Sequence, residues 1–176
     1  IIQSTFGGSQ SGTIYWVVQF DDLADMARSE AKLAASKEAM ALQQKIEQRY
    51  PTVSASIAKQ LLHLPGQTGN VNLIFVTDSK ADPAGLVELT KRAGKLDAKL
   101  SGNNPPTIRV LQETFAGSQT GALFTVVEFE SLEAYAKAQS QHAASREWAA
   151  LFKEIEQRYP TVSAELATVL SSRVGK

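Results

Sequence analysis

The stretch Glu-Gln-Arg-Tyr-Pro-Thr-Val-Ser-Ala occurs twice in this chain, at residues 47–55 and again at residues 156–164. Aligned at the offset that superimposes these two blocks, residues 1–67 match residues 110–176 without a gap. In that alignment roughly 31 of the 67 pairs are identical, which indicates a tandem duplication. The repeated block therefore marks the same point in two copies of one fold.

We interpret the block as a joint between a helix and a strand. A residue before proline is driven out of the α region, so Tyr50 and Tyr159 are predicted to end their helices. Arg49 and Arg158 then lie in the last helical turn, where a cation suits the negative end of the helix dipole. The alternative is that these arginines bind an anion at the mouth of a cavity.

The second copy predicts six elements in the order β-α-β-β-α-β, which is that of a ferredoxin-like unit. The strands are rich in β-branched and aromatic residues, Asp82-Pro83 is a helix start, and Gly102 to Pro106 stops that helix. The elements are expected at 71–77 (strand), 83–101 (helix), 107–115 and 122–129 (strands), 132–159 (one helix or two) and 163–171 (strand).

The first copy supplies only the last four of these elements, including a strand over 13–20, because residues 70–109 have no counterpart before Ile1. Ile1 begins inside a predicted strand, and we expect that the missing strand and helix precede it in a longer product or come from another chain. We divide the chain into a first repeat at 1–64, a linker at 65–70 and a complete second repeat at 71–176.

Both faces of the predicted strand at 122–129 carry apolar residues. Leu123, Val127 and Phe129 alternate with Phe124 and Val126. A sheet covered on both faces needs helices on one side and a second layer on the other. The predicted fold class is α+β, with two ferredoxin-like units whose sheets face each other in an α+β barrel.

Composition excludes several classes of protein. Apolar residues make up 43% of the chain and charged residues 20%, which favours a packed globular fold. Lysine plus arginine equals aspartate plus glutamate at 18 each, and this neutral balance argues against a nucleic-acid partner. No apolar stretch approaches the ~20 residues of a membrane helix. We recognise no targeting segment, and the default expectation is the cytoplasm.

Several motifs resemble the dimeric α+β barrel superfamily, which includes NIPSNAP-like, stress-responsive barrel and antibiotic-biosynthesis monooxygenase families. These are the hairpin Phe-x-Gly-Ser-Gln-x-Gly, the run Val-Val-x-Phe-x-Ser-Leu-x-Ala-Tyr that enters a helix, and Glu147-Trp148. The resemblance implies a bacterial-type barrel with a ligand cavity between sheet and helices, formed by a homodimer or between the two repeats. Fold alone does not select one activity within that group.

Positions at which the copies diverge are the better candidates for a site. His142 replaces Leu33, Tyr135 replaces Met26, Trp148 replaces Ala39 and Phe152 replaces Gln43. Histidine can act as a base or hydrogen-bond donor to a ring-shaped ligand, and the aromatic residues can line its pocket. Equally, the aromatic residues can fill the core while the histidine is satisfied structurally.

The remaining motifs give weaker signals. Trp16 diverges from Thr125 and is either a cavity residue or a core residue of its strand. The glycine-rich loops at 7–12 and 117–121 lack the lysine of a phosphate-binding loop, and we predict hairpin turns with positive φ. His63 is expected to be exposed, and its surroundings suggest no metal site and no cofactor.

The leading functional hypothesis is a barrel that binds a small apolar or aromatic molecule between sheet and helices, with Tyr135, His142, Trp148 and Phe152 nearby. One alternative is a cofactor-independent monooxygenase-like enzyme in which His142 is catalytic. Another is a structural or oligomerisation module without a pocket. Whether the chain is an enzyme is left open by the sequence.

Overall fold

The computed structural model describes the whole chain except residues 7–10, 78–80, 103, 116, 118–119 and 172–176. Its helices and strands are, in chain order, β1 (Ile2–Phe6), β2 (Ile14–Tyr15), α1 (Leu23–Ala35), α2 (Lys37–Arg49), β3 (Ile57–Leu64), β4 (Val71–Thr77), α3 (Pro83–Ser101), β5 (Thr107–Phe115), β6 (Leu123–Phe129), α4 (Leu132–Ala144), α5 (Arg146–Arg158) and β7 (Thr161–Val169).

The chain forms two compact units. Residues 1–16 and 56–176 form the sheet unit, and residues 17–55 form the helical unit. No helix in the described part of the chain is long and apolar enough to cross a membrane.

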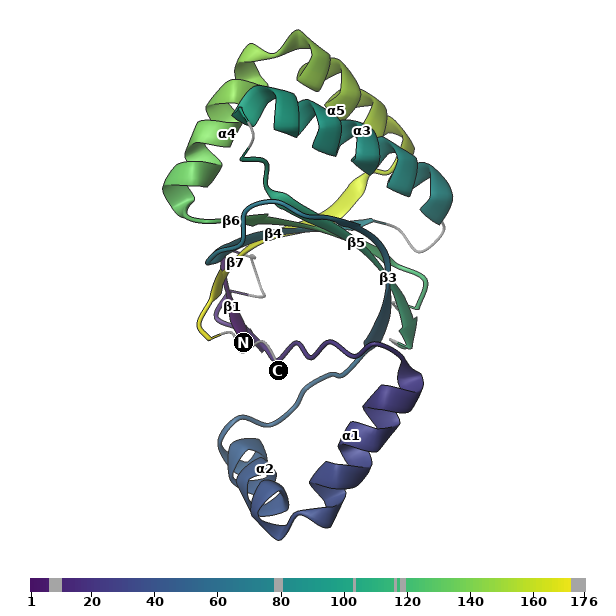
Figure 1. The fold of residues 1–176 in the computed structure, drawn as a ribbon, viewed down its shortest axis with the longest axis vertical. Coiled ribbons are helices and arrows are strands. Elements are labelled where there is room, and N and C mark those ends of the chain that lie inside the picture. Colours follow the sequence, from purple (N-terminus) through teal and green to yellow (C-terminus); the bar gives the residue numbers. More distant parts are fainter. Residues whose placement is uncertain (7–10, 78–80, 103, 116, 118–119, 172–176) are drawn as a thin grey trace. The chain divides into compact units, whose positions relative to one another are not determined.

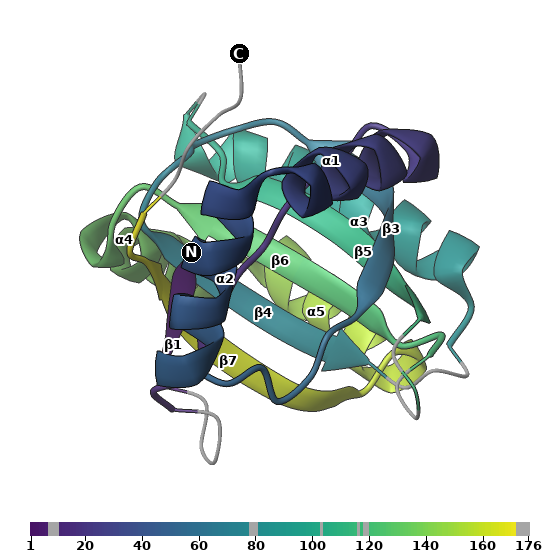
Figure 2. The same ribbon diagram turned by 90° about the horizontal axis from the view of Figure 1, so that it is seen from below.

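The sheet unit is built on one seven-stranded antiparallel sheet in the order β2-β1-β7-β4-β6-β5-β3. Figure 1 shows that the sheet curls, and Figure 2 shows β7, β4, β6 and β5 side by side. The fold is therefore α+β. We predicted two sheets that face each other; instead β1 pairs with β7 and β3 with β5, which joins strands of both sequence repeats into one sheet.

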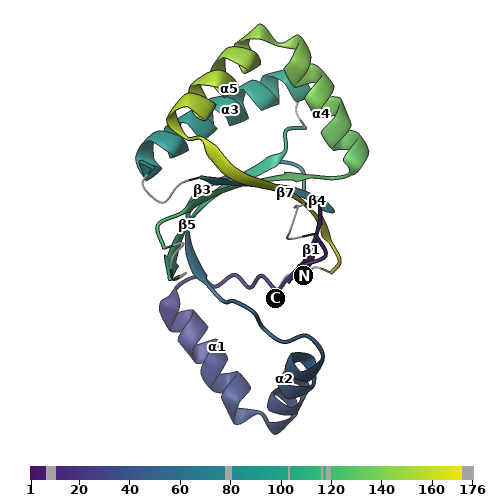
Figure 3. The same ribbon diagram turned by 180° about the vertical axis from the view of Figure 1, so that it is seen from behind.

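The core lies between this sheet and the helices α3, α4 and α5, which Figure 3 shows together on one face. Leu89 of α3, Val110 of β5 and Leu123 of β6 are at most 2% exposed and belong to one apolar cluster. Because side chains alternate along a strand, the residues next to Val110 and Leu123 in the sequence face the other side of the sheet, which is the concave side. The helices thus cover the convex face.

Local sequence signals set the ends of the helices. The Asp82 carboxylate accepts hydrogen bonds from the amides of Ala84 and Gly85, and Pro83 occupies the first turn of α3. Gly102 ends the helix at a φ of 63°, which costs glycine little. The segment after Ser131 forms two helices rather than one, because Ser145 ends α4 and caps α5.

The glycine-rich loops are hairpin turns where they are described. Gly12 and Gly121 occupy the same place in the two repeats and have φ values of 88° and 92°. Their amides donate to the carbonyls of Ser4 and Glu113, respectively, at 2.8 Å. Positive φ at both positions confirms the predicted turn chemistry. Parts of both loops lie outside the described residues.

The strand predicted over 13–20 is mostly absent. Only Ile14 and Tyr15 form β2, and residues 16–20 have no strand structure. Its counterpart β6 pairs along its length with β4 and along most of it with β5. Pairing on both sides holds β6 extended, whereas β2 pairs only with β1. The prediction for 16–20 was wrong because tertiary pairing, not strand propensity, decides this segment.

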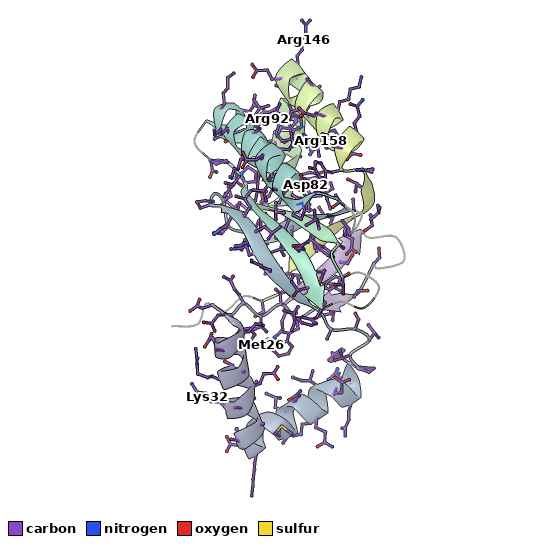
Figure 4. All side chains as sticks on the ribbon, turned by 90° about the vertical axis from the view of Figure 1, so that its right-hand side faces the viewer. Met26, Lys32, Asp82, Arg92, Arg146 and Arg158 are labelled. Carbon is purple, nitrogen blue, oxygen red and sulfur yellow. The ribbon has the colours of Figure 1, made fainter. Side chains whose placement is uncertain are left out.

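The helical unit consists of α1 and α2 with their flanking segments. The Asp22 side chain caps α1, and Ser36 ends α1 and caps α2. Figure 4 shows Met26 and Lys32 on α1. Neither helix contains a buried residue, although both carry large apolar side chains.

Candidate functional site

A serine joint places the two divergent residues with the most specific geometry. Ser145 lies between α4 and α5; its amide donates to the carbonyl of His142 at 3.0 Å, and its hydroxyl accepts from the amide of Trp148 at 3.1 Å. The joint therefore fixes the last turn of α4 against the first turn of α5. It brings His142 and Trp148 to the same side of the junction.

Asp97 of α3 completes the arrangement. Its carboxylate oxygen Oδ1 lies 2.5 Å from Nε2 of His142. Asp97 is 4% exposed and His142 is 9% exposed, so the pair is buried within the helix layer. The Asp97 oxygen and the His142 ring nitrogen share one hydrogen bond, in which the donor depends on the tautomer of the imidazole. Asp97 thus fixes the orientation of the His142 ring.

Trp148 packs flat against the imidazole. The two ring centroids are 3.6 Å apart and the rings are inclined by 9°. Trp148 itself is half-buried and contacts the apolar cluster. We name Asp97, His142 and Trp148 the aspartate–histidine cluster. It combines a buried hydrogen-bonded pair with one stacked indole ring.

The first repeat carries the same joint without the cluster. Ser36 accepts from the amide of Ala39 at 3.2 Å and donates to the carbonyl of Leu33 at 3.1 Å. Leu33 and Ala39 occupy the places of His142 and Trp148. The two repeats therefore share the backbone geometry of the joint, and only the second repeat places a histidine and a tryptophan there.

Two grooves run beside the cluster on the helix layer, one of about 480 Å³ and one of about 390 Å³. They lie between α3 and the pair α4–α5, and Glu147 lines both. Neither groove is lined by His142 or Trp148 themselves. The larger, which we name the Ser145 groove, is lined by Lys99, Leu100, Gln141, Ala144, Ser145, Arg146 and Glu147. The smaller, the Glu154 groove, is lined by Arg92, Leu96, Glu147, Ala150, Leu151 and Glu154.

Charges line the Glu154 groove. Arg92 and Arg158, which Figure 4 labels on the neighbouring helices α3 and α5, both pair with Glu154, at 2.9 Å and 3.6 Å. Arg158 also lies over the ring of Tyr159, 5.4 Å from its centroid. The Arg92 pair joins α3 to α5, whereas the Arg158 pair lies within α5, and both ion pairs are half-exposed and contribute little to stability. Arg158, which the sequence marked as a ligand-binding candidate, thus shares the single Glu154 carboxylate with Arg92.

The other predicted site residues contact different parts of the molecule. Tyr135 meets Phe129 edge-on, with centroids 5.4 Å apart, at the contact between α4 and β6. Phe152 is 46% exposed and Trp16 is 64% exposed. Arg49 belongs to the helical unit and lies over its neighbour Tyr50. Of the candidates, the structure brings together His142 and Trp148.

The concave face of the sheet carries one ion pair and one hydrogen bond between a tyrosine and a glutamate. Arg109 binds Glu128 at 2.7 Å between β5 and β6. The Tyr15 hydroxyl donates to Glu165 at 3.0 Å. Burial, together with the hydrogen bond and negative charge of Glu165, raises the pKa of Tyr15 to about 12. His63 follows on the same face beside Arg109 and is exposed, as expected.

Glu113 is a further buried carboxyl group. It is 8% exposed; Oε1 accepts from the Ser56 hydroxyl at 2.9 Å, and Oε2 is buried with no partner among the described residues. Burial raises the pKa of this carboxyl above its usual value, and the Ser56 hydrogen bond opposes that rise. The folded state therefore binds the Glu113 proton more tightly than the unfolded chain does.

We expect Glu113→Gln to gain stability relative to the unmodified protein as the pH rises from 4 to 7. The native pKa is raised, so the stability contributed by Glu113 is present below the unfolded pKa, near 4.5, and is lost as the pH rises through the folded pKa. Urea unfolding at both pH values measures the difference. Glu88→Gln is the control with the opposite trend, because Lys91 lowers the pKa of Glu88. An equal difference at both pH values for Glu113→Gln would contradict the assignment.

Sequence reasoning missed Asp97 and Glu113. Asp97 lies four residues after Ala93, inside the apolar stripe of α3, and an acidic residue at such a position was the available signal. It belongs to the segment without a counterpart, so comparison of the repeats could not single it out. Glu113 replaces Ser4 in the other repeat, and the rule of divergence would have found it.

Within the described residues, no group of three or more histidine, cysteine, aspartate or glutamate side chains could hold a metal ion. No protein-family model and no curated protein matches the chain. The candidate site therefore stands on its own geometry.

Proposed function

We propose that the protein binds a small apolar or aromatic molecule on the helix side of the sheet, at the aspartate–histidine cluster. The observation that carries this proposal is the imidazole of His142, held by the buried Asp97 carboxylate at 2.5 Å and stacked on Trp148 at 3.6 Å. An oriented imidazole offers a directed hydrogen bond, and the indole offers a flat apolar surface. The Ser145 groove opens beside the joint that carries both rings, and we propose it as the entry for the ligand.

A second part of the proposal concerns how the two repeats are built. We infer that the two sequence repeats form tandem ferredoxin-like units of an α+β barrel in which both repeats share the one curled sheet, the second repeat being complete and the first lacking its leading strand and helix. The pairing registers support this. Ala167 opposite Ser4 and Ala58 opposite Glu113 are the same two positions, with the repeats exchanged.

A cofactor-independent monooxygenase-like activity is the second candidate. One observation favours it: Asp97 orients His142 as a carboxylate orients a histidine general base. In this role His142 would accept a proton from a hydroxyarene. Oxygen uptake with hydroxyarenes measures the activity, and uptake that survives in His142→Ala would remove the histidine from the reaction.

The first repeat supplies the variants for the binding test. His142→Leu and Trp148→Ala install Leu33 and Ala39, the residues found at the same joint of the first repeat. His142→Leu is made together with Asp97→Ala, so that no buried carboxylate is left without its partner. We expect this double variant and Trp148→Ala each to weaken binding of naphthol-type ligands at least about tenfold, the loss of roughly one hydrogen bond or one aromatic contact. Titration calorimetry measures binding, and Lys32→Ala on α1 is the control.

Two results would contradict the binding proposal. The first is unchanged affinity in both variants, which would place the ligand elsewhere. The second is the absence of binding for every ligand of this class, with the variants losing only thermal stability. That outcome would show that the cluster serves only to pack the helices, and it would favour a structural or oligomerisation module without a pocket.

A further inference from the structure

The strands of the two repeats correspond, except that β4 of the second repeat has no counterpart in the first. In the second repeat, β4 lies between β7 and β6 and pairs with both along Val71–Thr77. The counterparts of β7 and β6 in the first repeat are β3 and β2. These are the two ends of the seven-stranded order. The two unpaired edges of the sheet, on β3 and β2, therefore correspond to the edges of β7 and β6 with which β4 pairs in the second repeat.

The strands at these edges are shortened where that partner is missing. β7 begins at Thr161, and its first residues pair only with β4. The counterpart of Thr161 is Thr52, yet β3 begins only at Ile57. On the other edge, β2 stops after Tyr15, and Trp16, Val17 and Val18 are 64%, 67% and 56% exposed. At both edges of the sheet, residues with strand propensity therefore have no strand to pair with.

The helices of the first repeat lack a cover in the same way. In the second repeat α3 packs against α4 and α5, and Leu151 and Tyr159 are 7% and 2% exposed. Their counterparts Leu42 and Tyr50 are 59% and 55% exposed, and α1 and α2 contain no buried residue. The helical unit thus presents the apolar face that α3 covers in the second repeat.

We propose that the edges of β2 and β3 bind one β-strand that is followed by an amphipathic helix, with the sequence pattern of Val71–Ser101. The strand pairs with both edges of the sheet unit, and the helix covers the apolar side chains of α1 and α2. In the second repeat β4 pairs with the corresponding strand edges and α3 covers the corresponding helices, so a strand followed by a helix is the pattern that fits each unit.

A second copy of the chain does not supply this segment. Its own β4 is paired on both edges, and its own α3 is packed in the core of its sheet unit. A copy could pair only an edge strand with an edge strand, and it has no free strand–helix segment to lie over α1 and α2. The occupant is therefore a strand–helix segment that is free to pair.

The test adds a synthetic peptide of residues 70–102 to the full chain and follows amide hydrogen exchange. We expect one peptide to bind per chain and to slow exchange at least about tenfold in residues 14–18, 52–64 and 23–49. The fluorescence of Trp16 should shift to shorter wavelength. A peptide with Ile74→Pro is the matched control, because proline removes a ladder donor from the strand.

A fusion tests the same proposal in cis. Residues 70–109, duplicated directly before Ile1, keep the register of the repeats, since Ile1 is the counterpart of Val110. In this fusion we expect Tyr50→Ala to destabilise the protein, with a fall in Tm of several degrees that is absent in the unmodified chain.

Three outcomes would overturn the proposal. One is unchanged exchange in residues 14–18 and 52–64 with saturating peptide, together with an exposed Trp16 in the fusion. Another is equal protection by the Ile74→Pro peptide. The third is a dimer of the chain alone in light scattering, with β2 and β3 protected, which would assign the edges to a second copy.

Discussion

Tyr159→Ala is expected to lower the free energy of unfolding of the sheet unit by about 3 to 5 kcal/mol, the range for removal of a buried aromatic side chain. Tyr159 is 2% exposed and belongs to the main apolar cluster. Its hydroxyl packs against the first turn of α3 at Gly85, where any side chain would collide with it. Urea unfolding followed by circular dichroism measures the loss.

Tyr50→Ala is the matched control, since Tyr50 stands at the same place in an identical block. It is 55% exposed, and we expect its removal to change stability by no more than about 0.5 kcal/mol. Equal losses in the two variants would show that the tyrosines serve the helix–strand joint itself. Unequal losses, in the expected order, would show that packing against α3 gives Tyr159 its effect.

Asp97→Ala is expected to cost about 3 kcal/mol, because it leaves the buried imidazole of His142 without its partner. The lost contact joins α3 to α4 within the helix layer, so nothing local replaces it. Thermal unfolding and urea unfolding measure the cost. In the double variant Asp97→Ala, His142→Leu the polar group is also removed, and we expect part of the stability to return.

The control for this second prediction is Asp25→Ala. Asp25 also pairs with a cation, Arg28 at 3.4 Å, but both side chains are exposed. Its removal should cost no more than about 0.5 kcal/mol. If Asp97→Ala costs as little as Asp25→Ala, the aspartate–histidine pair contributes no more than a surface ion pair.

Much of the secondary structure could be predicted from the sequence, because its signals are local. Asp82-Pro83 begins α3 and Gly102 ends it, as their capping chemistry indicated. The break between α4 and α5 at Ser145 was left open, since serine signals a cap only when its side chain turns to the backbone. Residues 16–20 failed as a strand for a tertiary reason, the lack of a neighbour on either side.

The candidate site was predicted only in part. His142 and Trp148 were found because the repeats differ there, and six residues of separation across two helices gave no sign that their rings would stack. Asp97 lies 45 residues before His142. A contact at that separation depends on how α3 crosses α4, which no local pattern encodes.

The block Glu-Gln-Arg-Tyr-Pro-Thr-Val-Ser-Ala separates the two levels. By itself it determines the local joint: the amides of Tyr50 and Tyr159 both donate to a carbonyl four residues earlier at 2.7 Å, and Thr52 and Thr161 both bond the glutamate of their block. Tertiary structure alone decides that Tyr159 is buried and Tyr50 exposed. Hydrogen bonds within a few residues are fixed by local sequence, whereas burial requires a distant surface, and here only the second repeat has α3.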